Sequence, residues 1–488
     1  MAVDAELRNV IETFVAAAAR PAVLDPGEDP LPLIPNQWSV SEWNGRLVLE
    51  AWDAKRNLVR KLVGLKEQRR GRLALTIERF PKTEGELQIA HLAAPSGREL
   101  ERKSSRAAFR ERFNLMLARE FPQWRIEEIS TEPNLEQSLS AVYTRALLRF
   151  GSNGMAAIAA APETLDCAGI VPFGLIWLDY LRRREKKLSI RHLLLYVPLH
   201  REREAAFRAA WIDRAAADCR LYGFDDRDRV GAIDFADTGN VDSTLPPCHQ
   251  DAPPPDIPVL REIPDAVAIR QSDGSIGLRI RGLEFARVTG GKFMCGISHR
   301  RRASPETVAE MARDIGVVRN RAAQDRQHPL YSLYPEGWLE SEIRAHPETI
   351  DATLMSTPIY GQVPIFSGAD CGIIDLLAID RAGRLAVIEI KASADVQLPF
   401  QALDYWLRVR KHLAAGDFER LGYFAGHVVR PETPRMLLVA PALEFHSTTE
   451  TLLSAFPPEI DVTRIGLAAS WRSELRVMFR LRGSERPD

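Results

Sequence analysis

Two acidic residues stand out near the C-terminus because each interrupts a strand-like apolar run. One run is IIDLLAID (373–380), the other is RLAVIEIK (384–391), and the loop Arg381-Ala382-Gly383 lies between them. A three-residue loop that ends in glycine is typical of a β-hairpin, because glycine accepts the left-handed backbone conformation that such a loop needs. We therefore expect a hairpin closed by Asp380 and Arg384.

This register has a chemical consequence. Counting outward from the loop, Asp375 comes opposite Glu389, and opposed side chains of an antiparallel pair share a face. Lys391, two residues beyond Glu389, lies on that face too. Two carboxylates at such a separation suit Mg²⁺ or Mn²⁺, which could polarise a phosphodiester and activate water, while the lysine stabilises the developing charge. The alternative is a cross-strand salt bridge without catalysis.

Three short motifs surround these residues, namely Gly372-Ile-Ile-Asp375, Ile388-Glu389-Ile-Lys391, and Gln401 with Tyr405 four residues later. Together they resemble the PD-(D/E)XK nuclease superfamily, most closely its RecB-like and archaeal mismatch-endonuclease branches, over about residues 335–480. The resemblance implies a restriction-endonuclease-like fold in which Asp375 and Glu389 bind the metal and Lys391 is catalytic. It also implies that Gln401 and Tyr405 lie beside the site. Ile374 replaces the proline that names the motif.

Two helices are expected to complete this site. Gln401, Tyr405 and Arg408 have helical spacing and form one polar stripe, which we expect to face the metal and the phosphates of DNA. The resemblance further implies an acidic residue from a helix before the first strand, and PEGWLESEIRAHP (335–347) is the candidate helix. We expect Glu340 to approach the metal, with Glu336 as second choice and Glu342 facing solvent. An ordinary helix surface is the alternative for each acid.

The whole chain is expected to be an α/β and α+β multidomain protein. Its 488 residues suggest about three or four domains. We expect a β-rich N-terminal domain with one helix at 1–135, an α/β domain at 136–250, a β-rich connector with a helix at 251–330, and a nuclease-like mixed sheet flanked by helices at 331–488. The proline-rich segment 245–258 marks one boundary, because it can form neither a helix nor a central strand.

The second domain has a weak internal resemblance to the fourth. Aligning MAAIAAA (155–161) with LAVIEIK (385–391) equates Ala159 with Glu389 and Ala161 with Lys391. The second domain would then be a degenerate nuclease-like copy without catalytic groups. Chance similarity between two β-α-β units is the preferred interpretation, and duplication is the alternative.

Charge limits how nucleic acid could be bound. Sixty-five Lys and Arg balance 66 Asp and Glu, so only local basic patches could attract a polyanion. Basic clusters occur at 66–72, 182–187 and 299–302. The last cluster, with Arg300, Arg301 and Arg302, is the first choice for DNA phosphates. Each cluster could instead be an ordinary solvated face.

Several other roles lack support in the sequence. The longest strongly apolar stretch, 168–178, is 11 residues and too short to span a membrane. The acidic N-terminus does not resemble a signal peptide, and the five cysteines form no CxxC pair, so we expect a reducing, cytoplasmic location. Thr289-Gly-Gly-Lys292 lacks the remaining residues of a phosphate-binding loop, so no nucleotide cofactor is expected.

The sequence therefore predicts a Mg²⁺- or Mn²⁺-dependent DNA endonuclease of repair or phage defence. A catalytically silent nucleic-acid-binding or regulatory protein with the same fold is the first alternative. A scaffold in which the two acids and the lysine form a buried ion network is the second. The sequence leaves open a homodimer or a partner protein.

Overall fold

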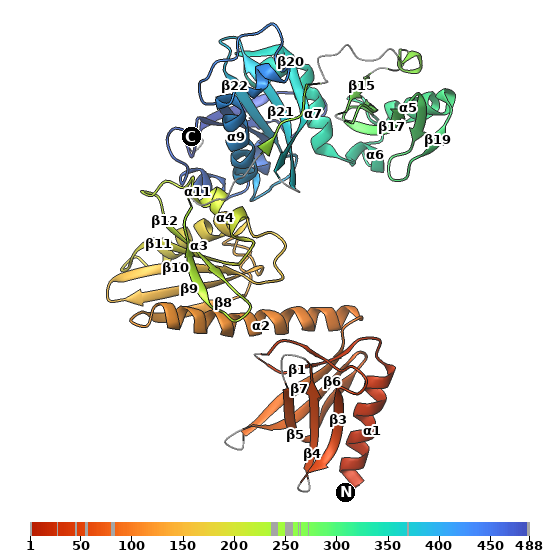
Figure 1. Cartoon of the computed structure of the whole chain (residues 1–488). Coiled ribbons are helices and arrows are strands. Elements are labelled where there is room, and N and C mark those ends of the chain that lie inside the picture. The colour runs from red at the N-terminus through yellow and green to blue at the C-terminus, as the bar shows by residue number, and fades with distance from the viewer. Residues whose placement is uncertain are drawn as a thin grey trace. The chain divides into compact units, whose positions relative to one another are not determined.

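The structure is a computed structural model that describes residues 2–26, 28–43, 46–53, 57–79, 83–235, 243–248, 257–261, 263, 265–271, 273–367 and 370–485. The chain forms two compact units, one of residues 1–202 and 220–232 and the other of residues 203–219 and 233–488. The described residues form four β-sheets with helices between them, which confirms a mixed α/β multidomain protein (Figure 1). No helix in this part of the chain is both long and apolar enough to cross a membrane.

The first unit begins with a helix and an antiparallel sheet. Helix α1 (Ala2–Ala17) packs Leu7, Ile11 and Val15 on one face of this sheet. The sheet has the strand order β2-β1-β7-β6-β5-β4-β3. Its strands are β1 (Pro21–Leu24), β2 (Leu31–Pro32), β3 (Trp38–Trp43), β4 (Arg46–Trp52), β5 (Asn57–Arg69), β6 (Arg72–Arg79) and β7 (Thr83–His91). A β-rich start preceded by one helix agrees with the sequence.

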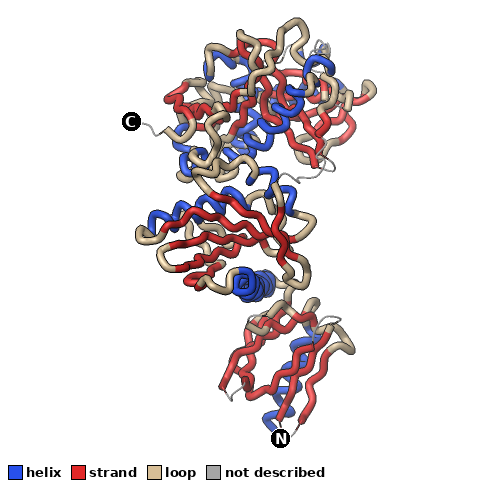
Figure 2. The backbone as a smooth tube through the Cα atoms, turned by 60° about the vertical axis from the view of Figure 1, so that its left-hand side comes forward, coloured by secondary structure: helices blue, strands red, loops and turns tan. Residues whose placement is uncertain are grey.

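A second sheet, with the order β13-β12-β11-β10-β9-β8, follows the long helix α2 (Pro95–Glu120), seen nearly end-on in Figure 2. Its elements are β8 (Arg125–Ser130), β9 (Tyr143–Phe150), β10 (Asn153–Ala160), α3 (Ile170–Arg184), β11 (Ser189–Pro198), β12 (Asp218–Phe224) and β13 (Val230–Ile233). The expected boundary at residue 135 is wrong, because β8 pairs with β9. Helix α2 was missed because its apolar residues, Phe109, Phe113 and Met116 among them, fill only its second half.

The second unit contains a five-stranded antiparallel sheet, here called the middle sheet, with the order β15-β16-β17-β18-β19. Its elements are η1 (Pro258–Leu260), β15 (Ala266–Arg270), β16 (Ile276–Ile280), β17 (Leu283–Thr289), β18 (Lys292–Cys295), β19 (Arg301–Ala303) and α5 (Pro305–Val318). The Ser304 hydroxyl caps α5 by accepting a hydrogen bond from the Thr307 N–H at 3.3 Å. Helix α5 then packs Val308, Ala312 and Ile315 on the sheet.

The C-terminal sheet has the order β14-β20-β21-β22-β23-β24-β25. Its elements are β14 (Ser243–Thr244), α6 (Pro329–Ser332), α7 (Pro335–Ala345), α8 (Pro347–Ile350), β20 (Leu354–Ser367), β21 (Asp370–Asp380), β22 (Leu385–Ile390), α9 (Leu398–Ala414), α10 (Asp417–Arg420), β23 (Arg435–Pro441), η2 (Ala442–Glu444), α11 (Thr449–Leu453), β24 (Val462–Leu467) and β25 (Val477–Arg482). Strands β22, β23 and β24 are parallel and the other pairs are antiparallel. The sheet is therefore mixed, as expected.

Helices cover both faces of the C-terminal sheet. On one face, Trp338 of α7 packs in a cluster with Ile388 of β22. On the other face, Val409 of α9 packs with Val387. Because neighbouring residues of a strand point to opposite faces, Glu389 lies on the same face as Val387, below α9. The fold thus directs the acidic residues toward α9.

The second sheet and the C-terminal sheet follow the same path. In each, six strands lie side by side in chain order, the third and fourth strands are parallel, and one helix, α3 or α9, joins them. Helix α3 packs on Ile158, and Ala159 lies on the opposite face with α2. If α3 corresponds to α9, Glu389 faces the joining helix whereas Ala159 faces away from it. Because side chains alternate along a strand, the aligned position must then shift by an odd number of residues. Ile158 and Ala160 are the alternatives, and neither has a carboxylate.

Two segments that precede residue 250 belong to the second unit. Residues 203–219, with most of α4 (Glu202–Ala209), join it, and the Arg208 guanidinium bonds Asp404 at 2.7 Å. Strand β14 pairs with β20 at the edge of the C-terminal sheet. The expected boundary at residue 250 is therefore wrong. Residues 249–256 of the proline-rich segment lie outside the described residues.

Candidate active site

The predicted hairpin is confirmed with its register. The Asp380 N–H donates to the Arg384 carbonyl at 2.9 Å, and the ladder runs outward to the pair Leu376–Ile388. Gly383 has φ +91°, and a Cβ there would lie 2.3 Å from the Val428 carbonyl oxygen. Beyond the last pair, the Asp375 carboxylate accepts a hydrogen bond from the Ile390 N–H at 2.9 Å. Asp375 therefore lies beside the end of β22, next to Glu389.

Lys391 only partly neutralises these acids. Its Nζ is 3.6 Å from Glu389 Oε1 and 3.9 Å from Asp395 Oδ2. The Glu389 side chain is 3% exposed, and its second oxygen, Oε2, is buried without a hydrogen-bond partner among the described residues. A buried carboxylate oxygen without a partner is costly. It is also the kind of ligand that a divalent cation would satisfy.

Helix α7 brings a third acid to this group. Glu340 is buried, and its Oε2 accepts a hydrogen bond from Gln362 Nε2 at 2.8 Å. Gln362, in β20, falls between the pairs Gly361–Leu376 and Val363–Ile374, and so opposite Asp375. Its φ of +53° is unusual for a residue other than glycine and indicates local strain at this point of the strand. A glutamine amide thus links Glu340 to the hairpin.

The other acids of α7 differ from one another. Glu336 is exposed, and its charge raises the pKa of both Asp375 and Glu389, so it approaches the site too. The expectation that Glu342 faces solvent is wrong. Glu342 is 5% exposed, accepts a hydrogen bond from the Trp338 indole at 2.9 Å, and pairs with Arg281 of the middle sheet and with Arg321. The buried indole N–H and the two arginines require this acceptor.

The acids crowd one another enough to hold protons near neutral pH. Burial, and then repulsion from Asp375, raise the pKa of Glu340 to about 7. Burial raises the pKa of Asp375 to about 6, although the Ile390 N–H and Lys391 oppose the change. Burial and the Asp375 charge raise the pKa of Glu389 well above its usual value. Burial alone would lower the pKa of Lys391, but attraction to Glu389 and the other acids outweighs it, so the pKa of Lys391 is raised.

The polar stripe of α9 lies over the same strands. Burial and the charges of Glu389 and Asp375 raise the pKa of Tyr405 to about 12, so this hydroxyl keeps its proton. A Cβ at Gly372 in β21 would lie 1.9 Å from Arg408 Nη1 and 3.0 Å from a Tyr405 ring carbon. The absence of a side chain at Gly372 therefore allows α9 to approach. Gln401 Oε1 is buried and has no partner among the described residues.

The arginine cluster at 300–302 is not part of this group. Arg300 bonds Glu284 at 2.7 Å, and Arg301 and Arg302 are exposed on β19. β15 and β19 are the two edges of the middle sheet, and Arg279 lies on β16, next to β15. Arg279 lines a cavity together with Gly361 and Gln362, so this arginine approaches the site instead.

Sequence reasoning missed Gln362 and Arg279. The signal for Gln362 was present, because it is the only amide or charged residue in the strand IYGQVPIF (359–366). Arg279 gave no such signal, because its approach to Glu340 depends on how the middle sheet packs against β20 and α7.

The arrangement suits a hard cation held by few protein ligands. Within the described ranges, no group of three or more His, Cys, Asp or Glu side chains has the geometry of a metal site. Mg²⁺, however, keeps several waters and often binds one or two carboxylates. Asp375 and Glu389, with the unpartnered Glu389 oxygen, could supply these. A scan against protein-family models and a search of curated proteins find no match for the chain.

The raised pKa values predict how a cation would affect stability. A carboxyl whose pKa is higher in the folded than in the unfolded state stabilises the fold at low pH, and this contribution is lost as pH rises through the folded-state pKa. The loss runs from about pH 4 to about pH 6 for Asp375 and to about pH 7 for Glu340, and is roughly 3 kcal/mol each. If Mg²⁺ binds here it would bind the ionised acids, so it should raise Tm more at about pH 8 than at about pH 5.5.

Thermal melts with Mg²⁺ and with EDTA at both pH values measure this difference. The same series on Asp375→Asn should show a smaller Mg²⁺ effect, because one ionisable ligand is gone. A Mg²⁺ effect of equal size at both pH values would mean that the cation binds elsewhere.

Proposed function

We propose that the protein is a Mg²⁺- or Mn²⁺-dependent nuclease that hydrolyses phosphodiester bonds of DNA, an endonuclease of repair or defence. The observation that carries the proposal is the Glu389 carboxylate, which is buried beside Asp375 and, despite the ion pair with Lys391, has one oxygen without a partner among the described residues. An ion network selected only for stability would not leave this oxygen without a partner.

The proposed fold is that of the PD-(D/E)XK superfamily. The mixed sheet supports it, with the acids on an antiparallel hairpin, β21–β22, and the polar stripe of α9 above them. Support also comes from the motif residues Gly372, Gln401 and Tyr405, which all lie on this face or on the helix that covers it.

Each side chain has a role in this proposal. A bound divalent cation would lower the pKa of a water molecule and polarise the phosphoryl oxygen. Asp375 and Glu389 would hold it, with Glu340 contributing from α7. The Lys391 ammonium, kept protonated by its acidic neighbours, would stabilise charge on the phosphoryl oxygens. Arg408 would contact a phosphate and Tyr405 would donate its phenolic proton in a hydrogen bond.

A second candidate is a catalytically silent protein that binds nucleic acid or regulates a partner. The Lys391–Glu389 ion pair favours it, since a lysine and a protonated acid can satisfy part of the buried charge without a metal. The two candidates differ in one measurable respect, because only the first requires a divalent cation for an activity.

A cleavage assay distinguishes them. Plasmid, linear duplex, single-stranded and forked DNAs, with matched RNAs, are incubated with Mg²⁺, Mn²⁺ or EDTA. Metal-dependent cleavage of at least one DNA, and slower or no cleavage of the RNAs, supports the nuclease. Binding without cleavage of any substrate supports the silent protein.

Removing the Glu340 charge should lower activity without abolishing it. Glu340→Gln retains the shape and the contact with Gln362 but withdraws one acid from the cation, so we expect roughly a tenfold to hundredfold lower kcat. Glu348→Gln is the matched control, because Glu348 is an exposed acid on the next helix, α8. Equal rates for Glu340→Gln and the control would show that Glu340 takes no part. Glu342 is unsuitable as a control because it is buried and doubly paired.

A further inference from the structure

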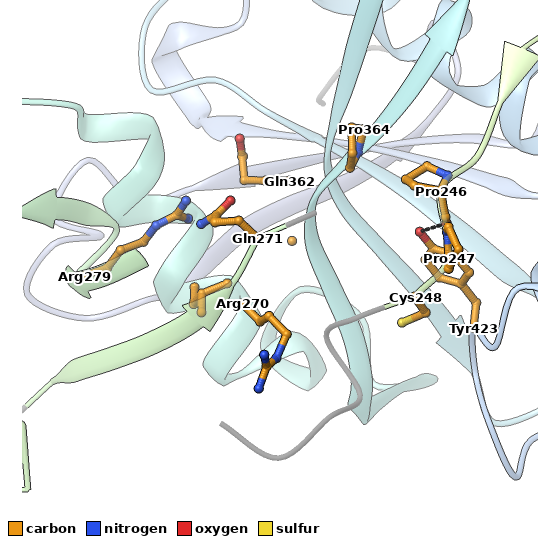
Figure 3. A pocket seen from close by; sticks show the side chains of 11 residues that line it. Pro246, Pro247, Cys248, Arg270, Gln271, Arg279, Gln362, Pro364 and Tyr423 are labelled. Atoms are coloured by element: carbon orange, nitrogen blue, oxygen red, sulfur yellow. Dashed lines mark hydrogen bonds between the residues drawn. The ribbon is translucent and has the colours of Figure 1, made fainter. Parts of the chain in front are cut away.

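A cavity lies within the second unit where the middle sheet meets β20. Its volume is about 40 Å³, room for roughly three water molecules. Arg270, Gln271 and Arg279 line it from the side of the middle sheet, and Gln362 and Tyr423 from the C-terminal part. Figure 3 shows the side chains of Arg279 and Gln271 beside Gln362, and the Arg270 side chain pointing away from them.

The cavity is lined by hydrogen-bond donors that have no acceptor. Arg270 Nε, Gln271 Nε2 and Arg279 Nε are all buried, and none has a partner among the described residues. Buried donors without acceptors are rare in proteins, and each suggests a missing ligand or water. Three of them around one cavity indicate a single acceptor-rich occupant.

The charges indicate the sign of this occupant. No ion pair with a described residue involves Arg270. Arg279 reaches Glu284 only at 3.3 Å, and Glu284 is shared with Arg287 and Arg300. Two further acids lie near the cavity: Glu340, whose carboxylate accepts a hydrogen bond from Gln362, and Asp375, which lies opposite Gln362. Arg270 therefore brings a positive charge that no described acid pairs, and water alone would supply an acceptor without neutralising it.

We propose that this cavity binds a phosphate group of the nucleic-acid substrate. Arginine suits this ligand, because its planar fork of donors matches the phosphate oxygens. Gln362 connects the cavity to the proposed metal site, since it lines the cavity and also bonds Glu340 opposite Asp375. A strand cleaved at Asp375 and Glu389 would thus place another of its phosphates in this cavity. The inference rests on the proposed function, and it makes the middle sheet part of the substrate site.

The test is DNA binding in EDTA, which needs no cleavage. Arg270→Gln should weaken binding about tenfold and reduce the slope of log K against log salt by about one, because one phosphate contact is lost. Arg270→Lys should retain the slope. Arg313→Gln is the control, with the same change of charge at an exposed position on α5, and it should change neither quantity.

A second variant, together with the Tm values, tests whether weaker binding results from misfolding. Gln271→Glu adds a negative charge to the cavity and should weaken binding at least as much, with Tm measured for every variant. If Arg270→Gln and Gln271→Glu both retain wild-type affinity and salt slope, the cavity is not a phosphate site, whatever the cleavage assay shows. If they bind as expected but the wild type never cleaves with Mg²⁺, the nuclease proposal fails and the phosphate site stands.

Three kinds of DNA distinguish an internal phosphodiester from a phosphate at the end of a strand. Circular single strands and linear strands with a 5′-hydroxyl carry only internal phosphodiesters, and linear strands with a 5′-phosphate add a terminal group. Loss of affinity for all three DNAs assigns the cavity to an internal phosphodiester. Loss confined to 5′-phosphorylated strands assigns it to a strand end. Equal affinity of variant and wild type for all three overturns the proposal.

Discussion

Asp375→Asn should lower Mg²⁺-dependent cleavage by about three orders of magnitude and leave the fold intact. The amide has the volume of the carboxyl group and can still accept the hydrogen bond from the Ile390 N–H. It lacks the charge that would hold the cation, and loss of several kcal/mol of transition-state stabilisation corresponds to roughly 10³-fold in rate. Removing this charge also relieves repulsion on Glu340 and Glu389, so the Tm without metal should not fall.

Single-turnover rates and thermal melts of the same preparations measure this. Asp314→Asn is the matched control, since Asp314 is exposed on α5 of the same unit, and it should cleave like the wild type. Undiminished cleavage by Asp375→Asn would refute the metal assignment. A lost activity accompanied by a large fall in Tm would support the buried ion network instead.

Arg208→Ala should lower the free energy of unfolding of the second unit by about 3 kcal/mol. The Arg208 side chain is 7% exposed, bonds Asp404 at 2.7 Å and Gln397 at 3.0 Å, and lies over the Phe400 ring. Removing one partner of a buried ion pair leaves the other charge uncompensated, at a typical cost of 3–5 kcal/mol. The lower value is expected because Asp404 is 21% exposed.

Urea denaturation followed by fluorescence measures this change. Arg203→Ala is the control from the same helix, because Arg203 is exposed, and it should have an effect below about 0.5 kcal/mol. The double variant Arg208→Ala with Asp404→Asn should recover part of the loss, since the orphaned charge is gone. Equal stability of the two single variants would mean that the α4 segment does not support the second unit.

The sequence predicted the parts of the candidate site that depend on local geometry. The three-residue loop fixes the pairing register, so Asp375 and Glu389 could be brought together from spacing alone. Helical periodicity did the same for Tyr405 and Arg408. Gln362 could not be included in this way, because its approach to Glu340 requires the pairing of β20 with β21 and the packing of α7.

Errors arose where distant segments determine the environment of a side chain. Glu342 occupies a position that looks solvent-facing on α7 alone, but Arg281 of the middle sheet packs against it. Arg300 seemed free to bind phosphate, yet Glu284 of strand β17 pairs with it. If α3 is equated with α9, Ala159 and Glu389 lie on opposite faces, because sequence similarity does not show which face of a strand a helix covers.

The segment 203–219 bears on the order in which the chain can fold during synthesis. It leaves the ribosome between β11 and β12 of the first unit, although its own partners belong to the second. Arg208 is 196 residues from Asp404, and the Asp213 N–H donates to the carbonyl of Ala455, still later in the chain. Since domains tend to fold as they emerge, the first unit can pair β11 with β12 before the partners of the segment between them have been synthesised. A nascent chain stalled before Asp404 would leave Arg208 without its carboxylate and Trp211 without the Trp406 ring that it packs against, so both side chains would stay exposed to solvent until the second unit is complete.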